Sequence, residues 1–597
     1  MQIVSNSKDL VTKAKLAKCC VSVLACSLML PAMFSGQVMA QAATGGSGLK
    51  QAIVRYESIH HPVKGNYGMV VSQNSTATLV GQRILAKGGN AVDAAVAVGF
   101  ALAVTLPRAG NLGGSGFMLV HEAESQKTTA LDYRSVAPLM ASVEQYQKPD
   151  GEMDWDKLTY GAMAPAVPGT VAAMHQAWQR FGSLPWKDLL RPAHKLAKDG
   201  FEIGHDLAAV LNMADEIFGF YSPAAAYLKK GENPWKAGDL LIQKDLGWSI
   251  KQIMDHGSDA FYKGKLADRI VAAFKKSGGI ITHKDLAGYR VKDRDPVQTG
   301  YRGKTVVSMP PVSGGGITLL QMLNMLENFP MADLGAGSAN SLHLMSEVMK
   351  RAAANRRSLI GDPDFVEVHI DGYINKELAK KMSADIDLQH STDVKDIQAE
   401  PVERYESRNT TQFSVMDRFG NAVSNTYTLG YSFGSGFVAE GTGILFDNQM
   451  RNFSYRSDNN HMNEMRPGKR MLSTMTPTLV LGEDGKVLVV TGTPGGSRII
   501  NVVLQVLVYV MDYNMNIAQA TEQPRIYQGW RSPKLAIEKG MNPEVIKLLE
   551  AMGHVIDMQQ TMGSTQSIMW QDGMFYGAAD SRRPNALAAG IDKLPKR

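Results

Sequence analysis

The last third of the chain alternates between β-hairpin signals and apolar helices, and this pattern constrains the fold most. Strand-like runs flank three turn sequences, at 417–420, 482–485 and 571–573. The run 499–512 is almost entirely apolar, yet it includes Asn501 and Gln505 and is too short to span a membrane. A second helix, 544–552, follows the cap residue Asn542. A helix that is apolar all round must be covered on all sides. Antiparallel hairpins beside buried helices therefore predict a layered α/β sandwich.

The earlier part of the chain is mainly helical by its apolar periodicity. We expect one helix over 76–87, a buried helix that begins near Asp93, and a strand over 117–120 after the glycine-rich loop 110–116. The stretch 165–400 indicates further helices with glycine and proline breaks. Charged residues become frequent in 377–408 without apolar periodicity, so this segment is expected to be exposed and loosely packed.

Length and charge exclude several classes of protein. The 597 residues are 44% hydrophobic and 20% charged, which is an ordinary globular composition that can bury a large core. The 63 basic and 57 acidic residues leave a formal charge of only +6, without a concentrated basic region. We therefore expect no nucleic-acid partner.

The N-terminal segment 1–40 has the three-part pattern of a secretory signal peptide. A lysine-rich start precedes the apolar stretch 19–34, and Ala40 closes a small-residue cleavage site. A retained membrane anchor or a lipoprotein site near Cys26 are the alternatives, but the apolar stretch is short for a span. All three cysteines, at positions 19, 20 and 26, lie in this segment. A mature chain starting at Gln41 would carry a net charge of +3, no cysteine and no stable membrane span, and it would be periplasmic or secreted.

Common catalytic motifs do not occur in the sequence. The 13 histidines include the pair His60 and His61, but there is no HExxH motif and no Cys/His cluster, so we predict no metal site. The glycine loop 110–116 lacks the lysine of a phosphate-binding loop, and no convincing G-x-S-x-G elbow is present. We expect no cofactor.

A pair of threonines, Thr410 and Thr411, opens the first strand of the hairpin region directly after the charged segment. A threonine hydroxyl is a weak nucleophile that needs a base, and a free α-amine on the same residue can be that base. Exposing the amine requires cleavage just before Thr410. The local residues alone favour the simpler interpretation that both threonines merely start a β-strand, where threonine is common.

The stretch 408–450 resembles the central signature of the γ-glutamyltranspeptidases, which are N-terminal-nucleophile hydrolases. Other motifs of that family recur in the family's order along nearly the whole chain. They are Ala109–Gly114, Asp132–Arg134, Ala166–Gly169, Gly361–Phe365, Leu445–Met450, Met471–Thr478, Gly492–Arg498 and Gly563–Ser567.

This resemblance implies a fold and a maturation step. The fold would be α/β (α+β), a four-layer αββα sandwich of the N-terminal-nucleophile type with a mostly helical large-subunit portion. The precursor would cut itself between Asn409 and Thr410. The products would be a large subunit of residues 41–409 and a small subunit of residues 410–597, which stay together as one intertwined catalytic domain.

The resemblance also implies a role for individual residues. Thr410 would be the nucleophile that forms the acyl-enzyme, assisted by the hydroxyl of Thr428. The backbone N–H groups of Gly495 and Gly496 would stabilise the oxyanion. Arg134 would bind the substrate α-carboxylate through two parallel hydrogen bonds; a surface ion pair with Asp132 is the structural alternative. Further contacts to the glutamyl group would come from Gln449, Asn452, Ser473 and Thr474.

Three positions depart from the family pattern. Asn452 replaces an aspartate that pairs with the substrate α-ammonium, and Arg451 beside it adds positive charge. Gly430 replaces an asparagine, and 453–473 is shorter than in members with a lid loop. A neutral acceptor binds a cation more weakly than a carboxylate does. These departures favour acyl groups that lack the amine, such as glutaryl.

The implied function is hydrolysis or transfer of γ-glutamyl groups. Donors would be glutathione and related compounds, and acceptors would be water or the amine of an amino acid or peptide. The alternatives are an acylase for glutaryl-type or cephalosporin side-chain amides and a non-enzymatic exported binding protein.

Overall fold

Two seven-stranded antiparallel sheets form the centre of the protein, as seen in a computed structural model that describes residues 58–214, 223–231, 233–397, 409–455, 461–530 and 532–594. Sheet I has the order β1 (Val63–Gly65), β20 (Met574–Ala579), β19 (Gln566–Gln571), β15 (Val487–Thr491), β14 (Thr478–Leu481), β9 (Lys304–Ser308) and β8 (Val297–Tyr301). Sheet II has the order β21 (Leu587–Gly590), β2 (Gly68–Ser72), β10 (Asn409–Asp417), β11 (Ala422–Gly430), β3 (Ser115–Glu122), β4 (Lys127–Tyr133) and β7 (Lys292–Arg294).

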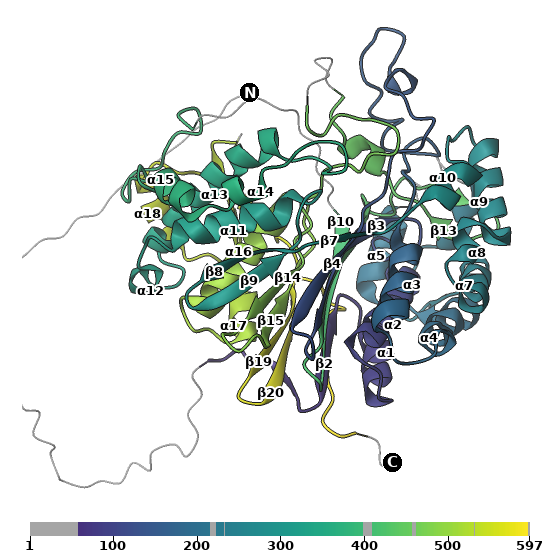
Figure 1. Ribbon diagram of the computed structural model, residues 1–597, viewed down its shortest axis with the longest axis horizontal. Helices are drawn as coiled ribbons and strands as arrows, with labels where there is room; N and C mark the ends of the chain where they lie inside the picture. Colours follow the sequence, from purple (N-terminus) through teal and green to yellow (C-terminus); the bar gives the residue numbers. More distant parts are fainter. Residues whose placement is uncertain are drawn as a thin grey trace, which may run out of the picture. The chain divides into compact units, whose positions relative to one another are not determined.

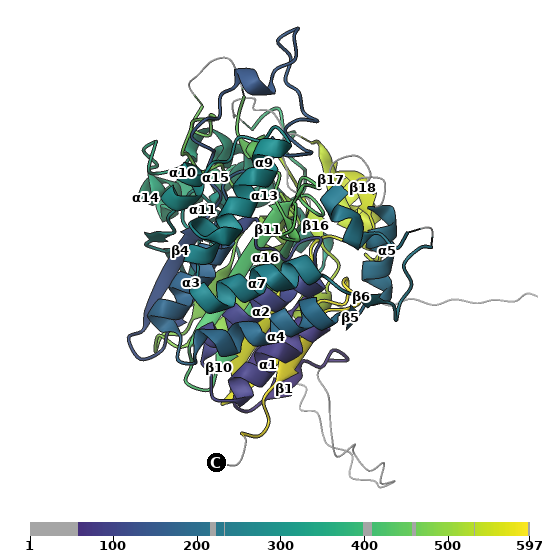
Figure 2. The same ribbon diagram turned by 90° about the vertical axis from the view of Figure 1, so that its right-hand side faces the viewer.

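The two sheets face each other across an apolar layer. Side chains from alternate strand positions meet there, among them Met69 and Phe117 from sheet II and Val490 and Ile568 from sheet I. Because side chains alternate between the two faces of a strand, the opposite face of each sheet is left to pack against helices. Figure 1 shows the sheets between two helical layers, and Figure 2 looks onto one of these layers.

The helices divide between the two outer faces. Sheet II is covered by α1 (Ser75–Ala86), α2 (Ala91–Thr105), α3 (Thr170–Phe181), α4 (Trp186–Asp199), α7 (Lys244–His256) and, further along this side, α5 (His205–Met213), α8 (Asp259–Tyr262), α9 (Lys265–Lys276) and α10 (His283–Gly288). Sheet I is covered by α11 (Gly314–Leu326), α13 (Ala339–Leu359), α16 (Arg498–Met511), α17 (Ile517–Glu522) and the outer helices α12 (Met331–Leu334), α14 (Ile370–Tyr373), α15 (Lys376–Ser383) and α18 (Pro543–Ala551).

Short elements complete the connections. They are the strand pairs β5 (Phe201–Glu202) with β6 (Leu240–Leu241) and β12 (Val438–Ala439) with β13 (Ile444–Leu445), the small sheet β16 (Ile526–Tyr527), β17 (Lys534–Glu538) and β18 (Val555–Gln559), and the 3-10 helices Glu144–Tyr146, Pro223–Leu228 and Gln449–Asn452.

Local sequence explains the two most buried helices. Asn90 caps α2 by accepting from the Asp93 N–H at 2.9 Å, and the Asp93 carboxylate accepts in return from the Asn90 N–H. Every residue of α2 is buried, and in α16 every residue after Arg498 is buried. Both helices pack directly against a sheet and beneath further helices, which is why each can be apolar all round.

The predicted four-layer αββα sandwich is confirmed, as are the three hairpins and the helices near 76–87, 93, 499–512 and 544–552. Two expectations were incomplete. The helical stretch 165–400 also supplies β7 to sheet II and β8 and β9 to sheet I. Within the charged segment, Lys376–Ser383 forms α15 with Ala379 buried and Asn375 as its cap, so this part is not loosely packed; residues 398–408 lie outside the described residues.

Residues on both sides of the Asn409–Thr410 bond contribute to both sheets. Sheet I takes β1, β8 and β9 from before this bond and its other strands from after it, and sheet II is mixed in the same way. Two fragments cut at this bond would share both sheets. The predicted signal segment 1–40 lies outside the described residues, and within the described ranges no helix has the length and apolar character needed to cross a membrane.

Candidate functional site

Thr410 and Thr428 lie opposite each other at one end of sheet II. Thr410 follows Asn409 at the start of β10, Thr428 lies near the end of β11, and the two are paired in the strand register with an irregularity between Asn409 and Thr410. The Thr410 side-chain hydroxyl donates to Thr428 Oγ1 at 3.3 Å, and Thr410 is 2% exposed. Thr428 Oγ1 also accepts from the Gly430 N–H at 2.8 Å. The register therefore brings together the two threonines that the sequence predicts.

The neighbouring Thr411 differs from Thr410. Its side chain is fully buried, and its hydroxyl has no hydrogen-bond partner among the described residues. Alternation along β10 turns Thr411 to the other face of the sheet. The strand therefore places only the first threonine of the pair beside Thr428.

Gln449 supports the end of β11. Its Nε2 donates to the Thr428 carbonyl oxygen at 3.3 Å, and its Oε1 accepts from the Ser115 hydroxyl at 3.0 Å. Ser115 is itself the strand partner of Thr428 on β3. The structure thus places Gln449 next to Thr428, although its side chain is buried and already bonded at both ends.

Arg134 immediately follows β4 at the same end of sheet II. Its Nε donates to the carbonyl oxygen of Met471 at 3.1 Å and its Nη2 to that of Leu472 at 3.2 Å. The side chain is about 1% exposed, and burial lowers its pKa to about 10, which leaves it charged at neutral pH. Among the described residues no carboxylate lies within ion-pair distance of Arg134, although the buried Asp447 and Asp132 carboxylates favour its charged form from further away. The guanidinium can therefore still form a direct ion pair with a ligand.

The alternative of a surface ion pair between Arg134 and Asp132 is wrong. The Asp132 carboxylate accepts from the backbone N–H of Arg134 at 3.0 Å, but it makes no bond to the Arg134 guanidinium. The ion-pair partners of Asp132 are Arg294, at 3.4 Å, and Arg470, at 3.5 Å. Asp132 therefore belongs to the buried charged network of Arg294 and Arg470.

Ser473 and Thr474 follow the two carbonyl groups that hold Arg134. The Thr474 hydroxyl donates to the carbonyl oxygen of Gly496 at 2.8 Å, which connects this segment to the loop after β15. Gly495 and Gly496 have φ values of +140° and +61°, which favour glycine. Their carbonyl groups accept from the N–H groups of residues 498 and 499 at the start of α16. Neither glycine N–H donates to an acceptor among the described residues, so both can serve a developing negative charge near a helix N-terminus.

The residues that depart from the family pattern also lie here. Asn452 ends the 3-10 helix Gln449–Asn452, and its carbonyl oxygen accepts from Asn463 Nδ2 at 2.7 Å. The Arg451 guanidinium donates to Thr159 Oγ1 at 2.7 Å and lies 4.4 Å from the centre of the Tyr431 ring, while its Nε has no partner in the described structure. Arg451 therefore brings a fixed positive charge to this side of the site.

The position of the Asn448 side chain leaves no room for a side chain at Gly430. With φ at +92°, a Cβ at position 430 would lie 2.1 Å from Asn448 Oδ1. That oxygen accepts from the Tyr431 N–H at 3.1 Å. The Asn448 amide thus occupies the space that a side chain at 430 would need.

Asp447 was not singled out by sequence reasoning, although it lies two positions before Gln449 in a family motif. Its carboxylate accepts from Ser135 Oγ at 2.6 Å, from the Ala166 N–H at 2.9 Å and from the Gln449 N–H at 3.3 Å. It therefore ties the neighbour of Arg134 to Gln449. Complete burial raises the pKa of Asp447 to about 7, despite these bonds and the nearby Arg134 charge, which both lower it.

Replacing Asp447 by asparagine should make stability less dependent on pH. Because the folded-state pKa is raised from 3.8 to about 7, the native protein loses stability as pH rises through this range, by up to about 4 kcal/mol above pH 7. An asparagine side chain has no charge to bury, and Ser135 can turn to accept from its amide. We expect the melting temperature of Asp447→Asn relative to wild type to be higher at pH 8 than at pH 5. If the difference in melting temperature between the variant and the wild type is the same at pH 5 and pH 8, the Asp447 carboxylate is not a buried charge.

No sequence motif indicated a group of potential metal ligands that the structure brings together. Atoms of His343, Glu347 and His554 lie within 4.8 Å of one another, all buried. His343 Nδ1 and His554 Nε2 share a hydrogen bond at 2.8 Å, and the Glu347 carboxylate already binds Lys350 at 2.6 Å and Arg351 at 2.7 Å. The cationic side chains of Lys350 and Arg351 already bind the Glu347 carboxylate, so this arrangement favours a structural network over a metal site.

Comparison with known proteins identifies the family. The sequence profile of the family described as Gamma-glutamyltranspeptidase matches residues 77–590. A glutathione hydrolase proenzyme of Escherichia coli K12 is 45% identical over 544 residues, covering 89% of this chain and 93% of that protein. The acylase ACY 1 proenzyme of Pseudomonas sp. SE83 is 34% identical over 90% of this chain and 96% of that protein.

A solved structure agrees with the sequence relatives. The cephalosporin acylase from Bacillus halodurans superposes with a TM-score of 0.80 at 26% identity, covering 92% of this chain and all of that chain. The paired threonines, the two glycine amides and the sandwich that holds them are thus found in a chain that matches one family over most of its length. The protein belongs to the gamma-glutamyltranspeptidase family.

Proposed function

We propose that the chain cuts itself between Asn409 and Thr410, and that the freed Thr410 then hydrolyses or transfers γ-glutamyl groups. The observation that carries this proposal is the Thr410 hydroxyl, buried at the start of β10 and 3.3 Å from the Thr428 hydroxyl. No other described threonine or serine combines a position directly after the charged segment with such a partner.

Self-cleavage would begin with attack of the Thr410 hydroxyl oxygen on the carbonyl carbon of Asn409. The peptide C–N bond breaks, and the nitrogen takes the hydroxyl proton to become the free α-amine of Thr410. Water then hydrolyses the resulting ester, which releases the Asn409 carboxylate. The products are residues 41–409 and 410–597, which remain interleaved in both sheets.

The α-amine of Thr410 then serves as the base. Its ordinary pKa of about 7.7–8 lets it accept the hydroxyl proton near neutral pH. The hydroxyl oxygen attacks the γ-carbonyl carbon of the donor, the leaving amine takes a proton, and an acyl-enzyme ester remains. Water or an acceptor amine cleaves this ester. Thr428 orients the nucleophile, and the N–H groups of Gly495 and Gly496 stabilise the oxyanion in both steps.

Recognition of the donor would centre on Arg134. No described carboxylate forms a direct ion pair with it, and two backbone carbonyl groups hold its guanidinium in place. A substrate α-carboxylate can accept two parallel bonds from it. Ser473, Thr474, Gln449 and Asn452 would contact the rest of the glutamyl group. Glutathione is the donor that we propose, with amino acids or peptides as acceptors, after export to the periplasm or the medium.

A second candidate activity is hydrolysis of glutaryl-type amides. The observation that favours it is the neutral Asn452 beside Arg451, whose guanidinium is fixed by Thr159 and Tyr431. A positive charge next to a neutral acceptor weakens the binding of a substrate ammonium group. Rates on γ-glutamyl and glutaryl 4-nitroanilides, measured in parallel, separate the two activities. Turnover of the glutaryl compound alone would make this second activity the correct one.

The Asn452→Asp variant tests the basis of this selectivity. A carboxylate at 452 would pair with the substrate α-ammonium, and a charge-assisted bond is about twice as strong as a neutral one. We expect kcat/KM for the γ-glutamyl anilide to rise by roughly 10-fold, while that for the glutaryl anilide stays level or falls. The glutaryl substrate is the internal control. An equal change on both substrates would show that Asn452 does not face the α-amine.

A further inference from the structure

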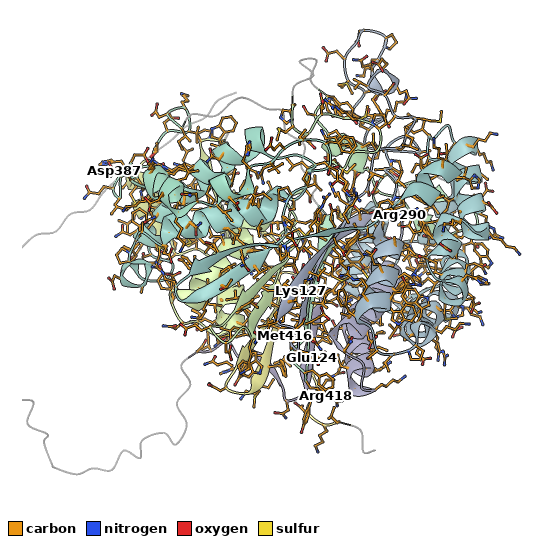
Figure 3. All side chains as sticks on the ribbon, viewed as in Figure 1. Glu124, Lys127, Arg290, Asp387, Met416 and Arg418 are labelled. Atoms are coloured by element: carbon orange, nitrogen blue, oxygen red, sulfur yellow. The ribbon has the colours of Figure 1, made fainter. Side chains whose placement is uncertain are left out.

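A cavity of about 310 Å³ lies at the end of β10 that is opposite Thr410. Six residue steps along β10 separate Thr410 from Met416 in the cavity wall, which is roughly 20 Å. The hairpin turns of both sheets surround the cavity, and Figure 3 places Met416 and Arg418 at this lower end of the sheets. Its volume suits one small molecule.

The inner wall of the cavity is apolar and aromatic. Met416, Val487 and Phe575 are nearly buried, and the Trp570 ring is half-buried beside them. They come from both sheets, so the cavity lies between the sheets and extends the apolar layer that joins them. Flat rings and a flexible methionine favour an aromatic ligand body.

The mouth of the cavity is positively charged. The Arg418 guanidinium lies 4.6 Å from the centre of the exposed Phe419 ring and has no carboxylate partner within the described residues. Lys486 Nζ lies 5.8 Å from the Trp570 ring, but it is also paired with Asp484 at 2.7 Å. Arg418 is therefore the charge that a ligand can neutralise.

Two polar groups give the cavity a defined shape. Gln126, with a left-handed φ of 52°, donates from Nε2 to the Asp484 carbonyl oxygen at 2.9 Å, which joins a turn of sheet II to a turn of sheet I. His121 is buried in the wall, and its Nδ1 bonds to Thr128 Oγ1 at 3.0 Å.

We propose that this cavity binds a small aromatic carboxylate. The ring packs against Trp570 and the exposed Phe419, over the nearly buried Met416 and Phe575, and the carboxylate accepts from the Arg418 guanidinium at the mouth. Glu124 and Lys127 lie on the adjoining hairpin but do not line the cavity. Because their charges are opposite, the net charge at the mouth of the cavity stays positive. This site is separate from the threonine site and does not depend on the reaction there.

Calorimetric titration of the purified protein with 2-naphthoate tests the proposal. We expect saturable binding at one site, equal in the wild type and in Thr410→Ala, and about 10-fold weaker binding of the neutral 2-naphthalenemethanol, which cannot form the charge-assisted bond. Arg418→Gln should weaken naphthoate binding by about 10-fold, since it removes a charge-assisted bond. Lys127→Gln is the matched control on the same surface and should leave affinity nearly unchanged.

A cavity-filling change gives an independent result. Ala123 lines the cavity, so Ala123→Phe should abolish binding while γ-glutamyl anilide activity and the melting temperature stay close to wild type. If Ala123→Phe fails to fold, the exposed Arg418→Gln change still decides the matter. Absence of saturable binding, equal binding of the alcohol, or equal losses in Arg418→Gln and Lys127→Gln would each overturn the proposal.

Discussion

The Thr410→Ala variant is expected to remain a single uncut chain without γ-glutamyl activity. Without the hydroxyl, the Asn409 carbonyl carbon has no adjacent nucleophile and no acyl-enzyme can form. Loss of a nucleophile costs roughly 10³-fold or more in rate, so both processing and turnover should fall below detection. A denaturing gel of the purified protein and an anilide assay measure the two effects.

Thr411→Val is the matched control for this experiment. Thr411 is the adjacent threonine, and its hydroxyl has no partner among the described residues, so replacing it removes no hydrogen bond. We expect normal cleavage and activity in this variant. Cleavage that persists in Thr410→Ala would refute the assignment, as would loss of cleavage in Thr411→Val with an unchanged melting temperature.

The Arg134→Gln variant is expected to lose roughly 10²- to 10³-fold in kcat/KM for γ-glutamyl anilide, mostly through a higher KM. A bidentate bond between charged groups stabilises a buried complex by about 3–4 kcal/mol in total. Glutamine can still donate to the Met471 carbonyl oxygen, so the loop that precedes Ser473 keeps one of its two supports. Initial rates over a range of substrate concentrations give the two constants.

Two controls separate recognition by Arg134 from general damage. A 4-aminobutyryl anilide lacks the α-carboxylate, so its turnover should be nearly the same in wild type and variant. Arg134→Lys keeps the charge but not the planar guanidinium. Its kcat/KM for the γ-glutamyl anilide should lie between those of the wild type and Arg134→Gln. If Arg134→Gln reduces turnover of both substrates equally, Arg134 supports the structure and does not bind the carboxylate.

Local patterns predicted a layered α/β sandwich with antiparallel sheets, and the family resemblance implied its four-layer order. The hairpins of β10 with β11 and β19 with β20 have turn residues between strand-like runs, and α16 is apolar on nearly every face. Such signals depend on neighbours in sequence. In contrast, β8 and β9 were hidden inside a mainly helical stretch, because each is short and β9 pairs with β14, which lies far along the chain.

The site could be predicted only in part, because some of its contacts join residues that are distant in sequence. The family motifs supplied Thr410, Thr428 and the two glycines, and the structure brings the threonines together. The environment of Arg134 required the fold, since the carbonyl groups that hold it, at 471 and 472, are distant in sequence. Asp447 gave no signal by composition, because a carboxylate in a polar motif is indistinguishable from an exposed one until its burial is known.

Self-cleavage would make Thr410 an N-terminal residue, and intact-mass measurement of the purified, exported protein shows whether it does. We expect two chains with the masses of residues 41–409 and 410–597, and a small chain whose first residue is threonine. A single uncut chain in an active preparation, or a small chain that begins at any residue other than Thr410, would contradict it.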